Sequence, residues 1–341
     1  MIGQPDRVTN LLSTADFDLV DELQSTSDML HTFIRNRLPE PGTPLASAAL
    51  HHFATPGKMV RAKMAIRAAN LLKIDVTAAL HWAVAIEVLH NASLIHDDIC
   101  DGDQLRRHRP SVWSLYGQNV ALTLGDWLIA LAFELAAEAG QRSQTPLLVK
   151  ILAQHMATTT AGEAAEFSTR TLFDWDSYLT IAADKTAPLL TAPMEGVAAM
   201  ALHANASAAI GTYFRCLGTA YQIANDILNF RALDGAANCG SDLARRAPNA
   251  VIVLYRQNLT PVQAIAFDDW FLSDDNAALC AWQLQILKSD AMALSAHHMH
   301  KTFDQTVYYA QVLPAGLSEV IAPVQALLKQ VCLKSVAPVN C

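Results

Sequence analysis

Apolar residues recur at helical spacing through nearly the whole chain, and strand-like alternation is rare. Such a pattern predicts an all-α protein. Connections between the apolar segments are short and carry helix-stopping residues, as at Pro39 to Gly42. We expect one domain over residues 1–341, a helical bundle with polar groups projecting into its interior. The expected helices cover residues 16–38, 46–54, 59–72, 78–95, 113–140, 145–167, 175–185, 189–202, 206–229 and 247–258, with a loop at 233–246 and further helical pattern without a motif at 260–341.

The composition favours a well-packed protein of the cytoplasm. Hydrophobic residues make up 52% of the chain and charged residues 16%, which argues against extensive disorder. The formal net charge of −8 argues against a general nucleic-acid-binding protein. The six cysteines have no metal-ligand spacing, and the first residues do not resemble a signal peptide. We therefore expect reduced thiols and cytoplasmic localisation.

Two of the most apolar stretches, at residues 120–139 and 186–202, are interrupted by the acidic residues Asp126, Glu134 and Glu195. A membrane-spanning helix needs about 20 consecutive apolar residues with few charges. We expect these stretches to be buried helices of the bundle, without stable insertion into a membrane.

The segment from Ser93 to Arg107 carries the clearest chemical signal. Asp97 and Asp101 are spaced to lie on one face of a helix, and Arg106 and Arg107 follow at once. Two neighbouring carboxylates repel each other unless a cation lies between them. Mg²⁺ is such a cation, and it usually completes its shell with water and phosphate oxygens. Arginines beside it suit a polyphosphate. The segment therefore suggests a diphosphate held through metal, although acidic and basic pairs are also common on solvated helix faces.

Further polar groups are weaker signals when each is taken alone. Lys58 and Arg61 begin a helix and could share one anion, but basic pairs are usually solvated. Glu163 and Glu166, three residues apart, read equally well as an exposed helix face. Lysine is favoured at helix C-termini, so Lys185 could stand there for that reason alone. Asn225, Asp226 and Asn229 are either candidate metal ligands or a polar patch at a helix end.

Taken in order, these segments resemble the trans-isoprenyl diphosphate synthases of the polyprenyl synthetase family. The resemblance runs from about residue 56 to residue 249. The matching segments are the basic segment at 56–62, His90, the first aspartate-rich motif at 96–101 with Arg106 and Arg107, Gly125-Asp126, an altered GQxxD at 162–166, Lys185-Thr186, an altered second aspartate-rich motif at 221–229 and an altered DLxxGKxT at 242–249.

The resemblance implies the all-α isoprenoid synthase fold, a homodimer and a Mg²⁺-dependent prenyltransferase. Such an enzyme joins an allylic prenyl diphosphate to isopentenyl diphosphate. Carried over by position, Asp97 and Asp101 would bind Mg²⁺ with Asp98 in support, and the altered second motif would add Asn225, Asp226 and Asn229. Arg106, Lys185, Thr186 and Gln222 would serve the allylic diphosphate or its cation. Lys58, Arg61, His90 and Arg107 would hold isopentenyl diphosphate.

Several positions depart from the family pattern. Asn225 and Asn229 replace two carboxylates of the second motif, Glu163 replaces a glutamine, and the family lysine falls on Ala247, with Arg245 and Arg246 close by. An Asn-Asp start also resembles class I terpene cyclases, in which Asn229 would take the serine position and Leu233 the glutamate position, with Asp234 one residue late.

Three functions remain open: a prenyltransferase, a family-derived terpene cyclase and a non-catalytic partner subunit. The transferase is favoured because Lys58, Arg61, His90 and Arg107 are all present, and a cyclase has no second substrate to bind. Short-chain members of the family often place a bulky aromatic residue four or five positions before the first motif. Here Ala92 and Ser93 are small, which favours a product of at least geranylgeranyl size.

Overall fold

The computed structural model describes residues 26–55, 57–168, 174–233, 240–273, 275–313 and 316–337. Residues 26–35 form a helix, and the other elements follow in chain order. They are α2 (Pro44–Phe53), α3 (Val60–Leu71), α4 (Val76–Asp101), β1 (Leu105–Arg106), β2 (Arg109–Pro110), α5 (Val112–Tyr116), α6 (Gln118–Arg142), α7 (Leu147–Ser168), α8 (Trp175–Met200), a 3₁₀ turn (Ala204–Ala206), α9 (Ser207–Phe230), α10 (Ser241–Arg245), α11 (Ala250–Gln257), α12 (Pro261–Phe271), α13 (Leu279–Lys288), α14 (Ala291–Gln311) and α15 (Leu317–Val336). The all-α prediction is confirmed.

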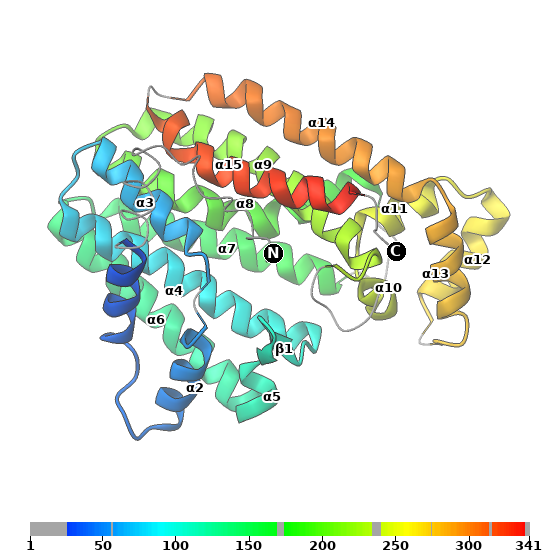
Figure 1. Ribbon diagram of the computed structural model, residues 1–341, viewed down its shortest axis with the longest axis horizontal. Helices are drawn as coiled ribbons and strands as arrows, with labels where there is room; N and C mark the ends of the chain where they lie inside the picture. The colour runs from blue at the N-terminus through cyan, green and yellow to red at the C-terminus, as the bar shows by residue number, and fades with distance from the viewer. Residues whose placement is uncertain are drawn as a thin grey trace, which may run out of the picture.

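The long helices pack as neighbours around one apolar core. Helix α4 packs against α3, α6 and α8, while α8 packs between α7 and α9. Helices α14 and α15 lie along α9, and α10 to α13 gather at one end of the bundle (Figure 1). Close approach is enabled at Gly196 of α8, where an added Cβ would lie 2.1 Å from the ring of Trp82 on α4. Trp82 also donates a hydrogen bond to the carbonyl of Pro193, at 3.2 Å.

Helix α4 is longer than the sequence predicted, and this extension positions the acidic residues. The helix begins at Asp75, whose carboxylate accepts a hydrogen bond from the amide of Ala78 at 2.8 Å. It ends at Gly102, which adopts φ 71°, a left-handed conformation that favours glycine. The first aspartate-rich motif therefore forms the last turn of a largely buried helix rather than a loop after it.

Three other boundaries differ from the prediction. The expected break between residues 185 and 189 was wrong, because α8 runs unbroken through Pro188, which packing against α7 and α9 stabilises. The expected helix at 113–140 is divided at Gly117, where φ is 88°. The expected loop at 233–246 contains the short helix α10, while residues 234–239, including Asp234, lie outside the described residues. Pro56 and the expected helical residues 16–25 lie outside them too.

Helices α4 and α6 are long and apolar enough to cross a membrane by length and composition alone. The apolar stretch of α4 is 78% buried inside the bundle, and that of α6 is 44% buried. The burial of the α4 stretch is typical of a helix in the core of a bundle.

Candidate active site

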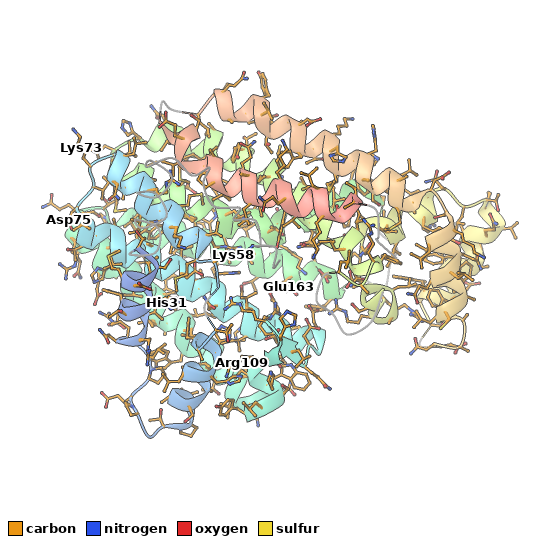
Figure 2. All side chains as sticks on the ribbon, in the orientation of Figure 1. His31, Lys58, Lys73, Asp75, Arg109 and Glu163 are labelled. Atoms are coloured by element: carbon orange, nitrogen blue, oxygen red, sulfur yellow. The ribbon has the colours of Figure 1, made fainter. Side chains whose placement is uncertain are left out.

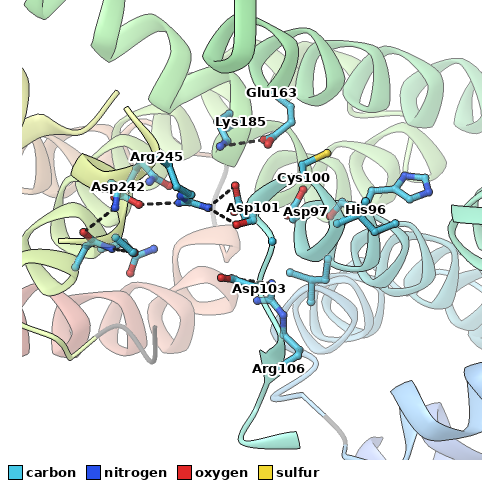
Figure 3. A pocket seen from close by; sticks show the side chains of 18 of the residues that line it. His96, Asp97, Cys100, Asp101, Asp103, Arg106, Glu163, Lys185, Asp242 and Arg245 are labelled. Atoms are coloured by element: carbon cyan, nitrogen blue, oxygen red, sulfur yellow. Dashed lines mark hydrogen bonds and ion pairs between the residues drawn. The ribbon is translucent and has the colours of Figure 1, made fainter. Parts of the chain in front are cut away.

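A cavity of about 1650 Å³ opens at the carboxyl end of α4. Its walls are formed by α4, the β1–β2 hairpin, α7, α8, α9 and α10 (Figure 3). Typical small-molecule pockets have volumes of roughly 300–1,000 Å³. The cavity is therefore large enough for more than one substrate. It brings together twelve of the fourteen predicted site residues, which are Arg61, His90, Asp97, Asp101, Arg106, Arg107, Lys185, Thr186, Gln222, Asn225, Asp226 and Asn229.

The first aspartate-rich motif presents two carboxylates to the cavity and turns the third away. Asp97 and Asp101 line the cavity on successive turns of α4. Asp98 is buried and accepts a hydrogen bond at 2.8 Å from Nε of Arg106, and Nη2 of Arg106 binds it too. Burial, and then the negative charge of Glu163, raise the pKa of Asp97 to about 7. Asp98 and Arg106 thus form a structural ion pair beside a repelling carboxylate cluster.

Two glutamates on α7 face this motif and bind Lys185 of α8. Nζ of Lys185 lies 2.9 Å from Oε2 of Glu163 and also binds Glu166. Burial acts against the charged form of Lys185, but the charges of Glu166 and Glu163 prevail and raise its pKa. The two helices come this close at Gly162, where an added Cβ would lie 2.8 Å from the backbone of Asp184. The interpretation of the glutamates as an exposed helix face was wrong, because both are partly buried.

The second motif offers mostly neutral or already bound groups. Asp226 accepts hydrogen bonds from the hydroxyl of Tyr178 and the amide of Ala250, both at 2.7 Å, and from Nε2 of Gln222 at 2.9 Å. Burial, and then the charge of Asp242, raise the pKa of Asp226 to about 8. Nδ2 of Asn229 donates to the hydroxyl of Ser241 at 2.7 Å, and Asn225 lines the cavity with a neutral amide.

A basic pocket adjoins the acidic one on the side of α3 and the hairpin. Arg61 and His90 line it, together with Arg107. Nε of Arg61 is buried and has no hydrogen-bond partner among the described residues. An orphaned buried donor of this kind is costly unless a ligand completes it. Burial, and then the charges of Arg61 and Arg107, lower the pKa of His90 well below its usual value, so its imidazole is neutral.

The hairpin fixes Arg107 by an uncommon backbone geometry. Pairing of Arg106 with Arg109 leaves Arg107 and His108 as the turn, with φ of 54° and 62°. Left-handed conformations cost about 1–2 kcal/mol for residues with a Cβ. Nη1 of Arg107 donates to the carbonyl of Thr55 at 2.6 Å, and an added Cβ at Gly57 would lie 2.6 Å from its Nη2. Lys58, by contrast, is exposed and does not line the cavity (Figure 2).

Arg245 was not among the predicted site residues, although it lies near the position of the family lysine. Nη1 of Arg245 lies 2.6 Å from Oδ1 of Asp101, and Nη2 lies 2.7 Å from Oδ1 of Asp242 (Figure 3). Burial acts to lower its pKa, but the charges of Asp101 and Asp242 raise it. Its place in the altered DLxxGKxT segment at 242–249, beside the position of the family lysine, was the signal that the sequence offered.

The two halves of the site differ in how well they fit Mg²⁺. No cluster of three or more His, Cys, Asp or Glu side chains forms a complete metal site among the described residues. Mg²⁺ commonly needs only one or two carboxylates when phosphate oxygens supply further ligands. Asp97 and Asp101 meet that requirement. The second motif does not, because Asp226 is bound by three donors and its neighbours are amides.

The cyclase pattern is incomplete in the described part of the chain. At the position where that pattern has a glutamate, Leu233 offers no oxygen ligand from its side chain and is 38% exposed. The one carboxylate near this position, Asp234, lies outside the described residues. Among the described residues, none therefore supplies the metal ligand that the cyclase pattern has at this position.

Comparison with known proteins places the chain in a family. A family model described as polyprenyl synthetase matches residues 43–282. The chain is 30% identical to heptaprenyl diphosphate synthase component 2 of Geobacillus stearothermophilus over 303 residues, covering 87% of this chain and 91% of that protein. It is 35% identical to the (2E,6E)-farnesyl diphosphate synthase of Mycobacterium tuberculosis over 176 residues, covering 50% of this chain and 48% of that protein. This second match spans only about half the length of that relative.

A solved structure agrees with the sequence relatives. The polyprenyl synthase of Caulobacter crescentus, complexed with calcium and isoprenyl diphosphate, matches with a TM-score of 0.75 and 25% identity, covering 94% of this chain and 97% of that one. The family model covers more than half of the chain, and the heptaprenyl relative is covered almost completely. The chain therefore belongs to the polyprenyl synthetase family.

Proposed function

We propose that the protein is a Mg²⁺-dependent prenyltransferase that joins an allylic prenyl diphosphate to isopentenyl diphosphate. The observation that carries this proposal is the meeting of an acidic and a basic pocket in one cavity. Asp97 and Asp101 form the acidic side, while Arg61 and Arg107 form the basic side. A reaction between two diphosphate substrates needs two binding sites. Here one diphosphate would be held through metal and the other by arginines. Membership of the family supports the same reaction.

In this proposal Asp97 and Asp101 hold Mg²⁺ against the allylic diphosphate. Bound there, the metal would stabilise the negative charge that develops on the departing diphosphate. Lys185 adds a fixed positive charge beside the cavity, held by Glu163 and Glu166. The carbon–oxygen bond breaks, diphosphate leaves, and an allylic cation remains. The apolar part of the cavity excludes water that would otherwise trap this cation.

The second substrate completes the reaction from the basic side. Arg61 and Arg107 would hold the diphosphate of isopentenyl diphosphate, and neutral His90 would donate one hydrogen bond. The double bond of isopentenyl diphosphate attacks the allylic cation and forms a carbon–carbon bond. Loss of a proton to the departed diphosphate restores a neutral chain. Gln222 is oriented by its donation to Asp226, so its Oε1, which accepts from Thr186 at 3.3 Å, can stabilise the cation.

A product assay tests the function directly. The purified protein is incubated with Mg²⁺, isopentenyl diphosphate and allylic diphosphates of increasing length, and the products are separated by chromatography. A longer prenyl diphosphate is expected. A hydrocarbon or alcohol that forms without isopentenyl diphosphate would identify a cyclase instead. No turnover alone, followed by turnover when a second family member is added, would identify a partner subunit.

We further propose a homodimer in which α6 contributes to the interface. Only 44% of the apolar stretch of α6 is buried. Leu122 of α6, at the rim of the cavity, is 50% exposed, and Leu115 of α5, which packs against α6, is 52% exposed. A second copy would cover this apolar face. Light scattering should give the mass of two chains, and Ala130→Glu on the exposed side of α6 should shift that mass toward one chain.

We also propose that residues 1–341 act as one domain in the cytoplasm.

The product is proposed to be of geranylgeranyl size or longer. Ser93 lines the cavity below Asp97, and the neighbouring lining residues Leu94 and Leu122 are aliphatic rather than aromatic. Small side chains at this level leave room for a growing chain. The length of the product in the assay above tests this directly.

A further inference from the structure

We propose that Arg245 takes the place of a metal ion in the half of the site that faces the second motif. The inference rests on the proposed function, because it concerns the charge around a metal-bound diphosphate in this cavity. Two carboxylates from distant parts of the chain, Asp101 and Asp242, meet at this arginine. In place of a second acidic motif that would recruit a cation from solution, the chain supplies a cation of its own.

The geometry is that of a bridging cation. Asp101 lies at 2.6 Å from Nη1 of Arg245, and Asp242 at 2.7 Å from Nη2. The side chains of Arg245, Asp101 and Asp242 are 31%, 23% and 15% exposed, so all three are partly withdrawn from water. Charge-assisted hydrogen bonds of this kind are roughly twice as strong as neutral ones. Figure 3 shows the arginine between the two carboxylates at the mouth of the cavity.

Helix α10 is anchored so that Arg245 stays in this position. The amide of Gly240 donates to the carbonyl of Asn229 at 3.0 Å, and Nδ2 of Asn229 donates to Ser241 at 2.7 Å. At the other end of α10, the guanidinium of Arg246 lies 4.0 Å from the ring centre of Trp270. Asn229 therefore holds α10 through its backbone carbonyl and through its side-chain amide.

A metal ion fits poorly beside this arrangement. Asp226 already accepts three hydrogen bonds, and Asn225 and Asn229 contribute only neutral amides. Asp242 accepts a further hydrogen bond at 2.8 Å from Nδ2 of Asn249 through its second oxygen. A guanidinium keeps its charge at every physiological pH. Oδ2 of Asp101 stays available for the proposed Mg²⁺ shared with Asp97, but a further divalent cation drawn to Asp242 and to Oδ1 of Asp101 would have to displace the guanidinium.

The consequence is a site that holds fewer metal ions than one with two acidic motifs. Arg245 lines the cavity and carries N–H donors that phosphate oxygens accept readily. It would supply, from the side of α10, positive charge that a metal bound at the second motif would otherwise supply.

The test counts metal ions without requiring turnover. Mn²⁺ is titrated into the full-length protein with saturating inorganic diphosphate, and free Mn²⁺ is measured by electron paramagnetic resonance. Arg245→Gln leaves Asp242 and Oδ1 of Asp101 without their cation, so this variant should bind one more Mn²⁺ per chain than the wild type, in addition to the ion proposed at Asp97 and Asp101. Arg215→Gln, which removes an exposed arginine paired with Asp184 outside the cavity, is the matched control and should bind as the wild type does.

An equal Mn²⁺ count in Arg245→Gln and wild type, with native circular dichroism, would overturn the inference. If Arg245→Gln does not fold, Asn225→Asp serves instead. It adds a carboxylate while Arg245 remains, so the Mn²⁺ count should stay unchanged, and a gain of one ion would overturn the inference. Failure of the proposed function is seen separately, since wild type that binds Mn²⁺ with diphosphate but makes no prenyl product rejects the reaction and leaves the ion count intact.

Discussion

Nζ of Lys185 lies 2.9 Å from Oε2 of Glu163, so the fixed cation of the site is paired with a residue of the neighbouring helix. Where the family pattern has a neutral glutamine, this chain therefore adds a negative charge next to Asp97. That charge is the second cause, after burial, of the raised pKa of Asp97. In the proposed site, the strength of metal binding would therefore depend on the charge of Glu163 as well as on the ionisation of Asp97.

Replacing Glu163 by glutamine should change how metal binding depends on pH. As a proposed ligand, Asp97 would bind metal in its ionised form, and its pKa is about 7, so affinity for Mn²⁺ should fall as the pH drops through 7 in the wild type. Glu163→Gln removes a charge that raises this pKa, and the midpoint of the loss should move to lower pH. Titrations of Mn²⁺ between pH 5.5 and 8.5 (about three units around that value) measure it. An unshifted midpoint would show that burial alone sets the pKa.

The carboxylates of α4 should be essential for turnover but not for folding. Asp97→Ala or Asp101→Ala removes a proposed charged ligand of the metal that stabilises the leaving diphosphate. Loss of one such stabilising group costs roughly 100- to 1,000-fold in kcat. Asp269→Ala is a matched control, because Asp269 is an exposed aspartate of α12 that does not line the cavity. Steady-state kinetics measures the loss of turnover, and circular dichroism checks that each variant is folded. A near-normal kcat in either site variant would reject the metal assignment.

The two basic residues at the start of α3 should differ in effect. Arg61 lines the cavity with a buried donor that has no partner among the described residues, whereas Lys58 is exposed. Arg61→Gln should raise KM for isopentenyl diphosphate roughly 10- to 100-fold, as expected for loss of a charge-assisted hydrogen bond. Lys58→Gln should have a much smaller effect. Equal increases in KM would mean that Lys58 moves into the pocket when substrate binds.

Local patterns in the sequence predicted the residues that share one helix. The spacing of Asp97 and Asp101 was enough to place both on one face of α4, because helical geometry relates residues four apart. Arg245 was not predicted as a partner of Asp101, which lies 144 positions earlier, because no local pattern encodes that contact. The pairing of Lys185 with Glu163 was missed for the same reason. It depends on Gly162, which lets α7 approach α8.

A proline inside a helix and a very short helix mark two of the errors in the fold. The sequence predicted one helix at 175–185 and another at 189–202, and Pro188, which removes one backbone hydrogen bond, lies in the gap between them. The structure keeps α8 intact because neighbouring helices cover both sides of it. Helix α10 was read as loop because five residues are too few for a recognisable apolar period. Its position depends instead on contacts with Asn229 and Trp270.

A bulky side chain at position 93 should shorten the product. The sequence predicted that both Ala92 and Ser93 lie near the path of the growing chain. In the structure Ser93 lines the cavity, whereas Ala92 is fully buried and does not line it. The hydroxyl of Ser93 donates to the carbonyl of His90 at 2.8 Å, so its side chain lies close to the helix and leaves space beside it.

Ser93→Phe would fill that space over about one helical turn of 5.4 Å, roughly the length of one isoprene unit. We expect products about one isoprene unit shorter than those of the wild type, with kcat for the first condensation retained. Ser93→Ala, which removes only the hydroxyl, is the control and should leave the product length unchanged. Chromatography of the dephosphorylated products measures the shift. Unchanged products from a folded Ser93→Phe protein would place the end of the chain path on another helix.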